Sequence, residues 1–219
     1  KMQIQSHIIT TVPVFDLESP LEKVIHFFKH TTYSHVAIVE DKIFLGVLSE
    51  NDLETFESDK KIEDYRYNLE SFYASVNTSW LDVLEIFARN ESNLLPVLDD
   101  EKQVMGYYNL NDIVGVFINT PFFTEPGGIL VLAKGIKDYS FSEIAQIVES
   151  NNTKLLGAFI TDVRNEVIQI TIKINTNNFN EVLHTFRRYN YTILMGNKDD
   201  QFIENLKDRS DYLDKYLNV

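Results

Sequence analysis

The chain has 219 residues, and its formal net charge is −13 at neutral pH. It contains no cysteine, which excludes disulfides, thiol nucleophiles and cysteine-ligated metal centres. Its hydrophobic fraction of 44% is typical of a soluble globular protein with one large domain or two small ones.

The acidity is uneven along the chain. Residues 1–120 carry 9 Lys and Arg against 20 Asp and Glu, whereas residues 121–219 carry 11 against 13. The change indicates two domains of different character. Because phosphate backbones attract clustered Lys and Arg, we expect no nucleic-acid partner. No apolar run reaches the roughly 18 residues that span a bilayer, and no signal-like stretch opens the sequence. We therefore expect a cytoplasmic protein with no membrane association.

The first elements form a unit that the chain repeats. Apolar residues at helical spacing predict a helix over 21–28, and a second stripe predicts another over 80–87. A short apolar strand, an acidic turn, a second strand with a glycine and another helix follow each of them. The aligned positions are Val36–Val39 over Leu95–Leu98, Gly46 over Gly106, and Asn51–Leu53 over Asn111–Ile113. Alternating helices and strands in two copies predict an α/β pair with pseudo-twofold symmetry.

The repeated segments read SHVAIVEDKIFLGVLSENDL and NLLPVLDDEKQVMGYYNLNDI. They resemble a tandem of cystathionine-β-synthase (CBS) domains, the pair known as a Bateman module. The resemblance covers about residues 6–118, with a first motif at about 6–57 and a second at about 72–118. It implies that residues 1–120 fold as one tandem pair.

The segment from Gly46 to Asp52 is the chemically interesting part of the first motif. Ser49 is a good N-cap residue, and its hydroxyl with the free N–H groups of a following helix can hold a phosphate oxygen. Asp52, one turn later, can accept hydrogen bonds from a ribose diol. The resemblance implies a site for an adenine nucleotide or S-adenosylmethionine, and it adds residues beside the base and at the closing segment: Thr11, Val12, Ser34, His35 and Val36.

Two further considerations bear on this site. Basic residues are few in this half, so a ligand of low charge, such as AMP or an adenosyl compound, suits it better than ATP. Ser-x-x-Asp at a helix start is also an ordinary capping arrangement, so a pair without a ligand stays an alternative.

The second motif is the poorer candidate, because Asn109 replaces the serine before Asp112, and bulky Tyr107 or Tyr108 is expected to fill a pocket.

The second half has its own pattern. Residues 58–72 are polar and predict a solvated connection with a short helix, while the prolines and glycines of 120–128 predict a domain boundary. The order strand–helix–strand–strand–helix–strand follows over 127–197, which is the ferredoxin-like α+β arrangement. Apolar residues over 198–219 predict an amphipathic C-terminal helix.

This βαββαβ unit resembles an ACT domain, and the whole chain resembles CBS–ACT regulatory proteins of the acetoin-utilisation B type. ACT domains that bind amino acids usually carry Asp-x-Pro-Gly after the first strand. The loop here is Asp138-Tyr139-Ser140-Phe141, so no amino-acid site is expected.

The sequence predicts no enzyme. It lacks the nucleophile-elbow, phosphate-loop and dinucleotide-binding motifs. His26 and His30 have the spacing of a metal pair, but no third ligand is evident, so no metal cofactor is expected. We expect a non-enzymatic, homodimeric regulatory sensor that binds an adenine-containing ligand. The alternative is a ligand-free module for dimerisation and protein interaction.

Overall fold

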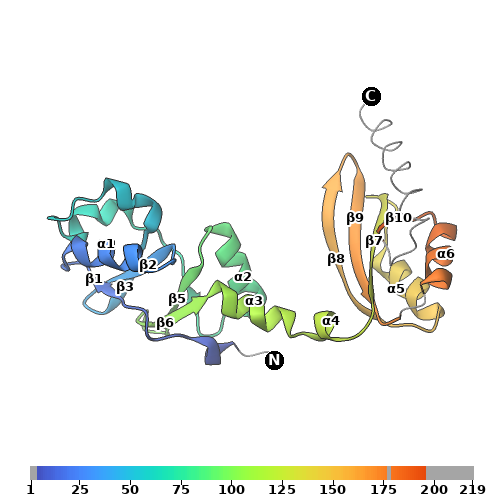
Figure 1. Cartoon of the computed structure of the whole chain (residues 1–219), viewed down its shortest axis with the longest axis horizontal. Helices are drawn as coiled ribbons and strands as arrows, with labels where there is room; N and C mark the ends of the chain where they lie inside the picture. Colours follow the sequence, from blue (N-terminus) through green and yellow to red (C-terminus); the bar gives the residue numbers. More distant parts are fainter. Residues whose placement is uncertain (1–3, 177–178, 196–219) are drawn as a thin grey trace. The chain divides into compact units, whose positions relative to one another are not determined.

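The computed structural model describes residues 4–176 and 179–195. The chain divides into two compact units, with the boundary between Ile118 and Asn119. Figure 1 shows the elements of both units. No helix in the described part of the chain is long and apolar enough to cross a membrane.

The first repeat builds a three-stranded sheet with helices beside it. The sheet order is β1-β2-β3, with β1 parallel to β2 and β3 antiparallel to it. Its strands are β1 (Phe15–Asp16), β2 (His35–Glu40) and β3 (Ile43–Ser49). Its helices are α1 (Leu21–His30) and the 3-10 helices η2 (Glu50–Thr55) and η3 (Ile62–Asn68), whereas the 3-10 helix η1 (Gln5–His7) precedes it and contacts Val76 of the second repeat.

The second repeat has the same architecture. Its sheet order is β4-β5-β6, again with one parallel and one antiparallel pairing. Its elements are β4 (Ala74–Ser75), α2 (Trp80–Arg89), β5 (Leu94–Leu98), β6 (Val104–Asn109) and α3 (Leu110–Ile118). Both hairpins shift register at equivalent positions of the repeat. The shift lies between Ile38 and Val39 in the first hairpin and between Val97 and Leu98 in the second. The predicted internal repeat is therefore present in the structure.

The two repeats contact each other through equivalent residues. The Ser34 N–H donates to Oδ1 of Asn93 at 2.8 Å, and the Asn93 N–H donates to Oγ of Ser34 at 2.9 Å. At the far end of the hairpins, Ile43 forms a bridge with Gln103. Because Ser34 and Asn93 occupy the same position in the two copies, these reciprocal bonds mark a pseudo-twofold relation.

Each repeat also receives a strand-like segment from outside its own hairpin. Ile9, near the start of the chain, exchanges two backbone hydrogen bonds with Tyr107 on β6. Glu70, in the connection between the repeats, exchanges two with Val47 on β3. The segment before the first repeat therefore completes the second, and the connection completes the first.

One local expectation needs correction. The helix expected after Ser49 is present, as a six-residue 3-10 helix. The connection 58–72 contains the expected short helix, but it is not simply solvated, because η3 buries Ile62 and Tyr65 in the core of the first repeat. The segment is kinked at Tyr65, whose φ of −113° and ψ of 19° are not helical, and both side chains are buried on either side of the first 3-10 turn.

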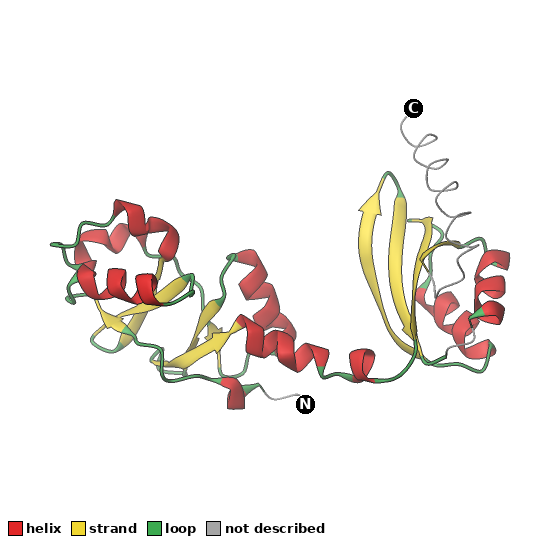
Figure 2. Ribbon diagram, viewed as in Figure 1, coloured by secondary structure: helices red, strands yellow, loops and turns green. Residues whose placement is uncertain are grey.

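The second unit follows the predicted order of elements. After α4 (Pro121–Thr124) come β7 (Gly128–Gly135), α5 (Phe141–Ser150), β8 (Leu155–Arg164), β9 (Val167–Ile174), α6 (Asn180–Arg188) and β10 (Thr192–Met195). The sheet order is β10-β7-β9-β8, and all neighbours are antiparallel. Helices α5 and α6 lie on one face of this sheet (Figures 1 and 2).

The core of this unit comes from strict alternation in β9. Ile168, Ile170, Ile172 and Ile174 are buried, and they pack with the apolar faces of α5 and α6. Asn165 and Glu166 turn the chain between β8 and β9 with positive φ angles of 47° and 63°. The helix expected over 198–219 lies outside the described residues. The ACT-like identity of the unit stays a prediction.

Candidate functional site

The first motif lies where β2 begins and β3 ends. His35 and Ser49 are paired across these strands, and both are buried. The Ser49 hydroxyl accepts a hydrogen bond from the Asn51 N–H at 3.2 Å, which confirms that Ser49 is a cap. The Glu50 N–H donates to the carbonyl of Ser34 at 2.7 Å. The Glu50 N–H is therefore already paired within the protein, whereas the Ser49 hydroxyl is used as an acceptor and keeps its O–H as a donor.

Asp52 is the free acidic group of this motif. It is half-buried, and its negative charge weakly opposes the lowering of the pKa of His35 that burial causes. Within the described part of the chain, its carboxylate has no hydrogen bond or ion pair, so its oxygens are available as acceptors. The structure thus brings together Ser34, His35, Ser49 and Asp52.

His35 is held on three sides. Its Nδ1 lies 2.8 Å from Oγ of Ser34, its Nε2 lies 3.6 Å from Oε1 of Glu70, and its ring packs edge-to-face on Phe72 with centroids 5.1 Å apart. Burial lowers the pKa of His35, and the carboxylates of Glu70 and Asp52 partly oppose this shift. A neutral imidazole in fixed orientation is the result, suited to lining a pocket.

Two predicted residues lie further along the same strands. Val36 is fully buried, and its backbone pairs with Leu48 on β3. Gly46 faces Ile38, and a Cβ there would lie 2.7 Å from the carbonyl oxygen of Glu70. Gly46 is therefore needed for the close approach of the connecting segment, which is a structural reason for its presence.

Thr11 and Val12 belong to the segment that pairs with the second repeat. They lie between Ile9, which bridges to Tyr107, and Pro13, whose carbonyl accepts a hydrogen bond from the Tyr107 hydroxyl at 2.7 Å. Thr11 is exposed, and Val12 packs against the core of the first repeat. The segment that pairs with β3 of the first motif is instead the one that contains Glu70.

The second motif reproduces the capping geometry of the first. Oδ1 of Asn109 accepts from the Asn111 N–H at 2.9 Å, and the Leu110 N–H donates to the carbonyl of Asn93 at 3.0 Å. Asp112 is exposed, whereas Asp52 is half-buried. The structure therefore places Asn109 and Asp112 in the same local arrangement, with a more open acidic group.

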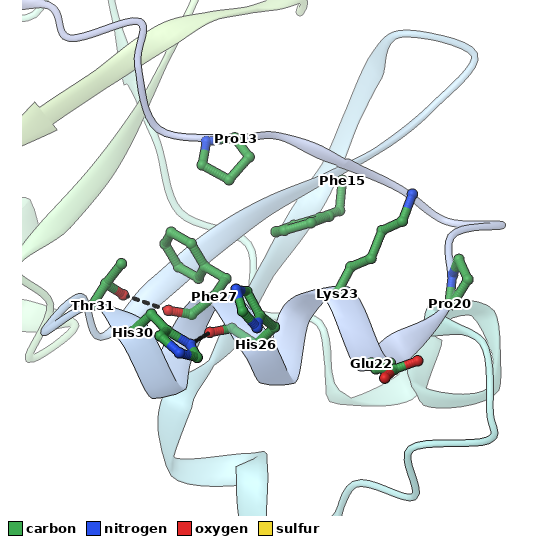
Figure 3. Close-up of a pocket in the computed structure, with 9 residues that line it drawn as sticks. All are labelled: Pro13, Phe15, Pro20, Glu22, Lys23, His26, Phe27, His30 and Thr31. Atoms are coloured by element: carbon green, nitrogen blue, oxygen red, sulfur yellow. Dashed lines mark hydrogen bonds between the residues drawn. The ribbon is translucent and has the colours of Figure 1, made fainter.

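An apolar groove runs along α1 (Figure 3). Its volume is about 580 Å³, and the rings of Phe15 and Phe27 meet there edge-to-face at 6.1 Å. His26 and His30 form part of the lining, with their rings stacked 4.0 Å apart and Nδ1 of His30 2.8 Å from the carbonyl of His26. No cluster of three metal-ligating side chains occurs among residues 4–176 and 179–195.

A second pocket of about 510 Å³ adjoins Ser34, between α2 and the start of α3. Of the residues predicted from the sequence, only Ser34 is among those that line it. Leu84, Phe87 and Ala88 of α2 give it an apolar wall. This pocket lies on the α2 side of the Ser34–Asn93 contact.

Several residues that shape the site were missed from the sequence. Glu70 and Phe72 contact His35 from the connecting segment, and Asn93 contacts Ser34 from the second repeat. For Asn93 a signal existed, because it aligns with Ser34 in the repeat. No pattern pointed to Glu70 and Phe72, since their role depends on a pairing between distant segments.

The comparisons agree with the repeat. The family model of the CBS domain matches residues 5–57 and residues 64–119. No curated protein matches the chain. Similar solved structures include a CBS domain pair/ACT domain protein from Thermotoga maritima, with 18% identity over 53% of this chain and 97% of that one, at a TM-score of 0.48.

Two further structures show similarity of the same order. CBS domains of a transcriptional regulator from Streptococcus pneumoniae share 10% identity over 52% of this chain and 98% of that one, at a TM-score of 0.47. CBSX2 in complex with AMP shares 13% identity over 54% of this chain and 97% of that one, at a TM-score of 0.45. The family assignment rests on the two matches to the family model and on the repeated fold. Residues 5–119 of this chain are a pair of CBS domains.

Proposed function

We propose that this is a non-enzymatic regulatory protein whose CBS pair binds an adenine-containing small molecule at the first motif. The observation that carries the proposal is the Asp52 carboxylate, half-buried beside His35 and without a hydrogen bond or ion pair among the described residues. A carboxylate in this position can accept two hydrogen bonds from a ribose diol. Ser34, His35, Ser49 and the backbone of Val36 form the rest of the proposed site, and Gly46 allows the connecting segment to close it.

The charges around this position favour a ligand of low negative charge. Glu70 and Asp52 both act on His35, and Glu50 follows Ser49 directly. The Glu50 N–H is already paired with the carbonyl of Ser34, so the Ser49 O–H is left as the donor of this pair for a phosphate, and a polyphosphate gains little there. Repulsion by carboxylates adds to this cost. AMP or an adenosyl compound such as S-adenosylmethionine therefore suits the site better than ADP or ATP.

The regulatory mechanism we propose is linkage. A ligand that binds one arrangement of the CBS pair more tightly shifts the population toward that arrangement, by as much as its affinities differ. A partner that reads this arrangement then responds to the ligand. The second unit, as an ACT-like domain in a homodimeric, cytoplasmic protein, is the proposed route of that response. We propose no nucleic-acid partner, because the whole chain has a net charge of −13 and would repel a phosphate backbone.

Calorimetric titration of the full chain with AMP, ADP, ATP and S-adenosylmethionine tests the proposal. We expect binding of at least one of AMP and S-adenosylmethionine, and weaker binding of ATP. Asp52→Ala should weaken that binding roughly a hundredfold, since charge-assisted hydrogen bonds are worth about 1.5–3 kcal/mol each. Asp112→Ala is the matched control at the equivalent position and should change it little. Equal affinity in Asp52→Ala and the unmodified chain would contradict the site.

A second candidate is a ligand-free module for interaction and dimerisation. The observation that favours it is the internal pairing at both motifs, where the cap side chains accept from the helix backbone and the next N–H groups donate to carbonyls of the protein. Such a pair keeps its fold without a ligand. The absence of heat from all four titrations, together with a dimeric mass by light scattering, would support this candidate over the first.

A further inference from the structure

Tyr107 belongs to the second repeat but packs in the core of the first. Its side chain is fully buried, and it contacts the apolar cluster that surrounds β2 and α1. Its hydroxyl donates to the carbonyl of Pro13 at 2.7 Å and accepts from the Ala37 N–H at 3.0 Å. The phenol thus bridges two backbone groups from different segments, and burial raises the pKa of Tyr107, which keeps it protonated.

The equivalent place in the other half is built differently. The repeat aligns Tyr107 with Val47 and Ala37 with Pro96. Pro96 has no N–H and therefore needs no acceptor. Val47, which has no hydroxyl to offer one, leaves no donor unpaired there. Ala37 has an N–H that points away from β3, because the facing Val47 N–H bonds to Glu70 instead. Tyr107 supplies the acceptor that this N–H requires.

Tyr107 also lies on the same face of β6 as Asn109, the cap residue of the second motif. Side chains two residues apart in a strand point to the same side, so Tyr107 shares a face of β6 with Asn109, as Val47 shares a face of β3 with Ser49. A large ring therefore stands beside the second cap residue, where the first motif has a small aliphatic group. The same ring contacts the segment that contains Thr11 and Val12 through its bond to Pro13.

We propose that Tyr107 closes the second motif to ligands, so that each chain holds one adenine-containing ligand, at the first motif. This inference rests on the proposed function for the position of that ligand. The carbonyl of Pro13 and the N–H of Ala37 form an acceptor and donor pair that a planar heterocycle can read. Tyr107 already satisfies both groups, and a ligand has to displace a fully buried phenol to reach them.

Calorimetric stoichiometry of the full chain, with AMP and S-adenosylmethionine as probes, tests the closure. The unmodified chain is expected to bind one equivalent per chain. Tyr107→Val places the residue of the first repeat in the second, and it should add a second equivalent. Tyr107→Leu removes the ring and the hydroxyl but keeps more of the buried apolar volume, so it keeps the test available if Tyr107→Val unfolds.

Tyr108→Phe is the matched control. Tyr108 is equally buried on the next residue of β6, and its hydroxyl has no hydrogen-bond partner in the described part of the chain. It should leave the stoichiometry at one.

The possible outcomes separate this inference from the proposed function. Two equivalents in the unmodified chain, with affinity that depends on Asp52 and Asp112 alike, would overturn the closure but keep the first site. No binding to the unmodified chain and one equivalent in Tyr107→Val would support the closure and contradict the proposed first site. No gain of binding in either opened variant would overturn the closure.

Discussion

The two CBS repeats share one fold but differ in what fills the space beside each cap residue. The first repeat has Val47, a half-buried Asp52 and a buried His35, whereas the second has Tyr107, an exposed Asp112 and the apolar Leu94. Hairpin pairing and the capping bond are the same in both, although a 3-10 helix follows the first cap and an α-helix the second. The two repeats therefore share their caps and the close approach of an outside segment, and they differ in the side chains beside each cap.

The largest expected effect concerns the two glycines at which outside segments approach the hairpins. A Cβ at Gly106 would lie 2.5 Å from the carbonyl oxygen of Ile9, and φ at this residue is 152°. Gly106→Ala is expected to destabilise the first unit by about 2–4 kcal/mol, because backbone strain adds to the overlap.

Gly46→Ala should lower the free energy of unfolding by less than Gly106→Ala, since its clash is milder and no unusual φ accompanies it. Gly115→Ala on α3, which meets no atom within 4 Å, should be neutral or stabilising by up to about 1 kcal/mol. Urea unfolding of the three variants measures this order. A Gly106→Ala protein as stable as Gly115→Ala would contradict the described approach of Ile9.

The next effect separates the two neighbouring tyrosines of β6. Tyr107→Phe removes both hydrogen bonds and leaves the Pro13 carbonyl and the Ala37 N–H unpaired. A loss of about 1–3 kcal/mol in unfolding free energy is expected. Tyr108→Phe removes a buried hydroxyl without a partner among the described residues, so it should be neutral or stabilising. Equal losses in the two variants, measured by chemical denaturation, would show that the bridge adds no stability.

The smallest effect is a dependence of stability on pH that only the first repeat should show. Burial lowers the pKa of His35 in the folded protein, so the unfolded chain binds this proton more readily. The free energy of unfolding therefore falls as the pH drops through about 6.5, which is the pKa of His35 in the unfolded chain, and it continues to fall below that pH. Glu70→Gln should steepen this decrease, because the Glu70 carboxylate partly opposes the shift.

His35→Gln should make the same decrease shallower. Thermal unfolding between pH 5 and pH 8 measures the slope for each variant, and identical slopes in all three proteins would refute the assignment.

Much of the fold was predictable because it depends on local periodicity. The alternation in β9 and the apolar stripes of α1 and α2 come directly from residue spacing, and the repeat set the pairing of the two hairpins. The site was harder to predict, because Glu70 and Tyr107 act through contacts between segments about 20 to 100 residues apart. Thr11 and Val12 were grouped with Ser49 by resemblance, but their segment pairs with β6. The short 3-10 helix after Ser49 was not foreseen, since Ser-x-x-Asp caps either kind of helix.

The central claim, that a ligand binds at the first repeat and not at the second, is tested most directly by nuclear magnetic resonance. Backbone amide spectra of the full chain are recorded while AMP or S-adenosylmethionine is added. The account predicts shift changes concentrated at residues 34–36 and 49–52, with residues 109–112 unchanged, and their loss in Asp52→Ala. Changes concentrated at residues 109–112 that persist in Asp52→Ala would contradict it.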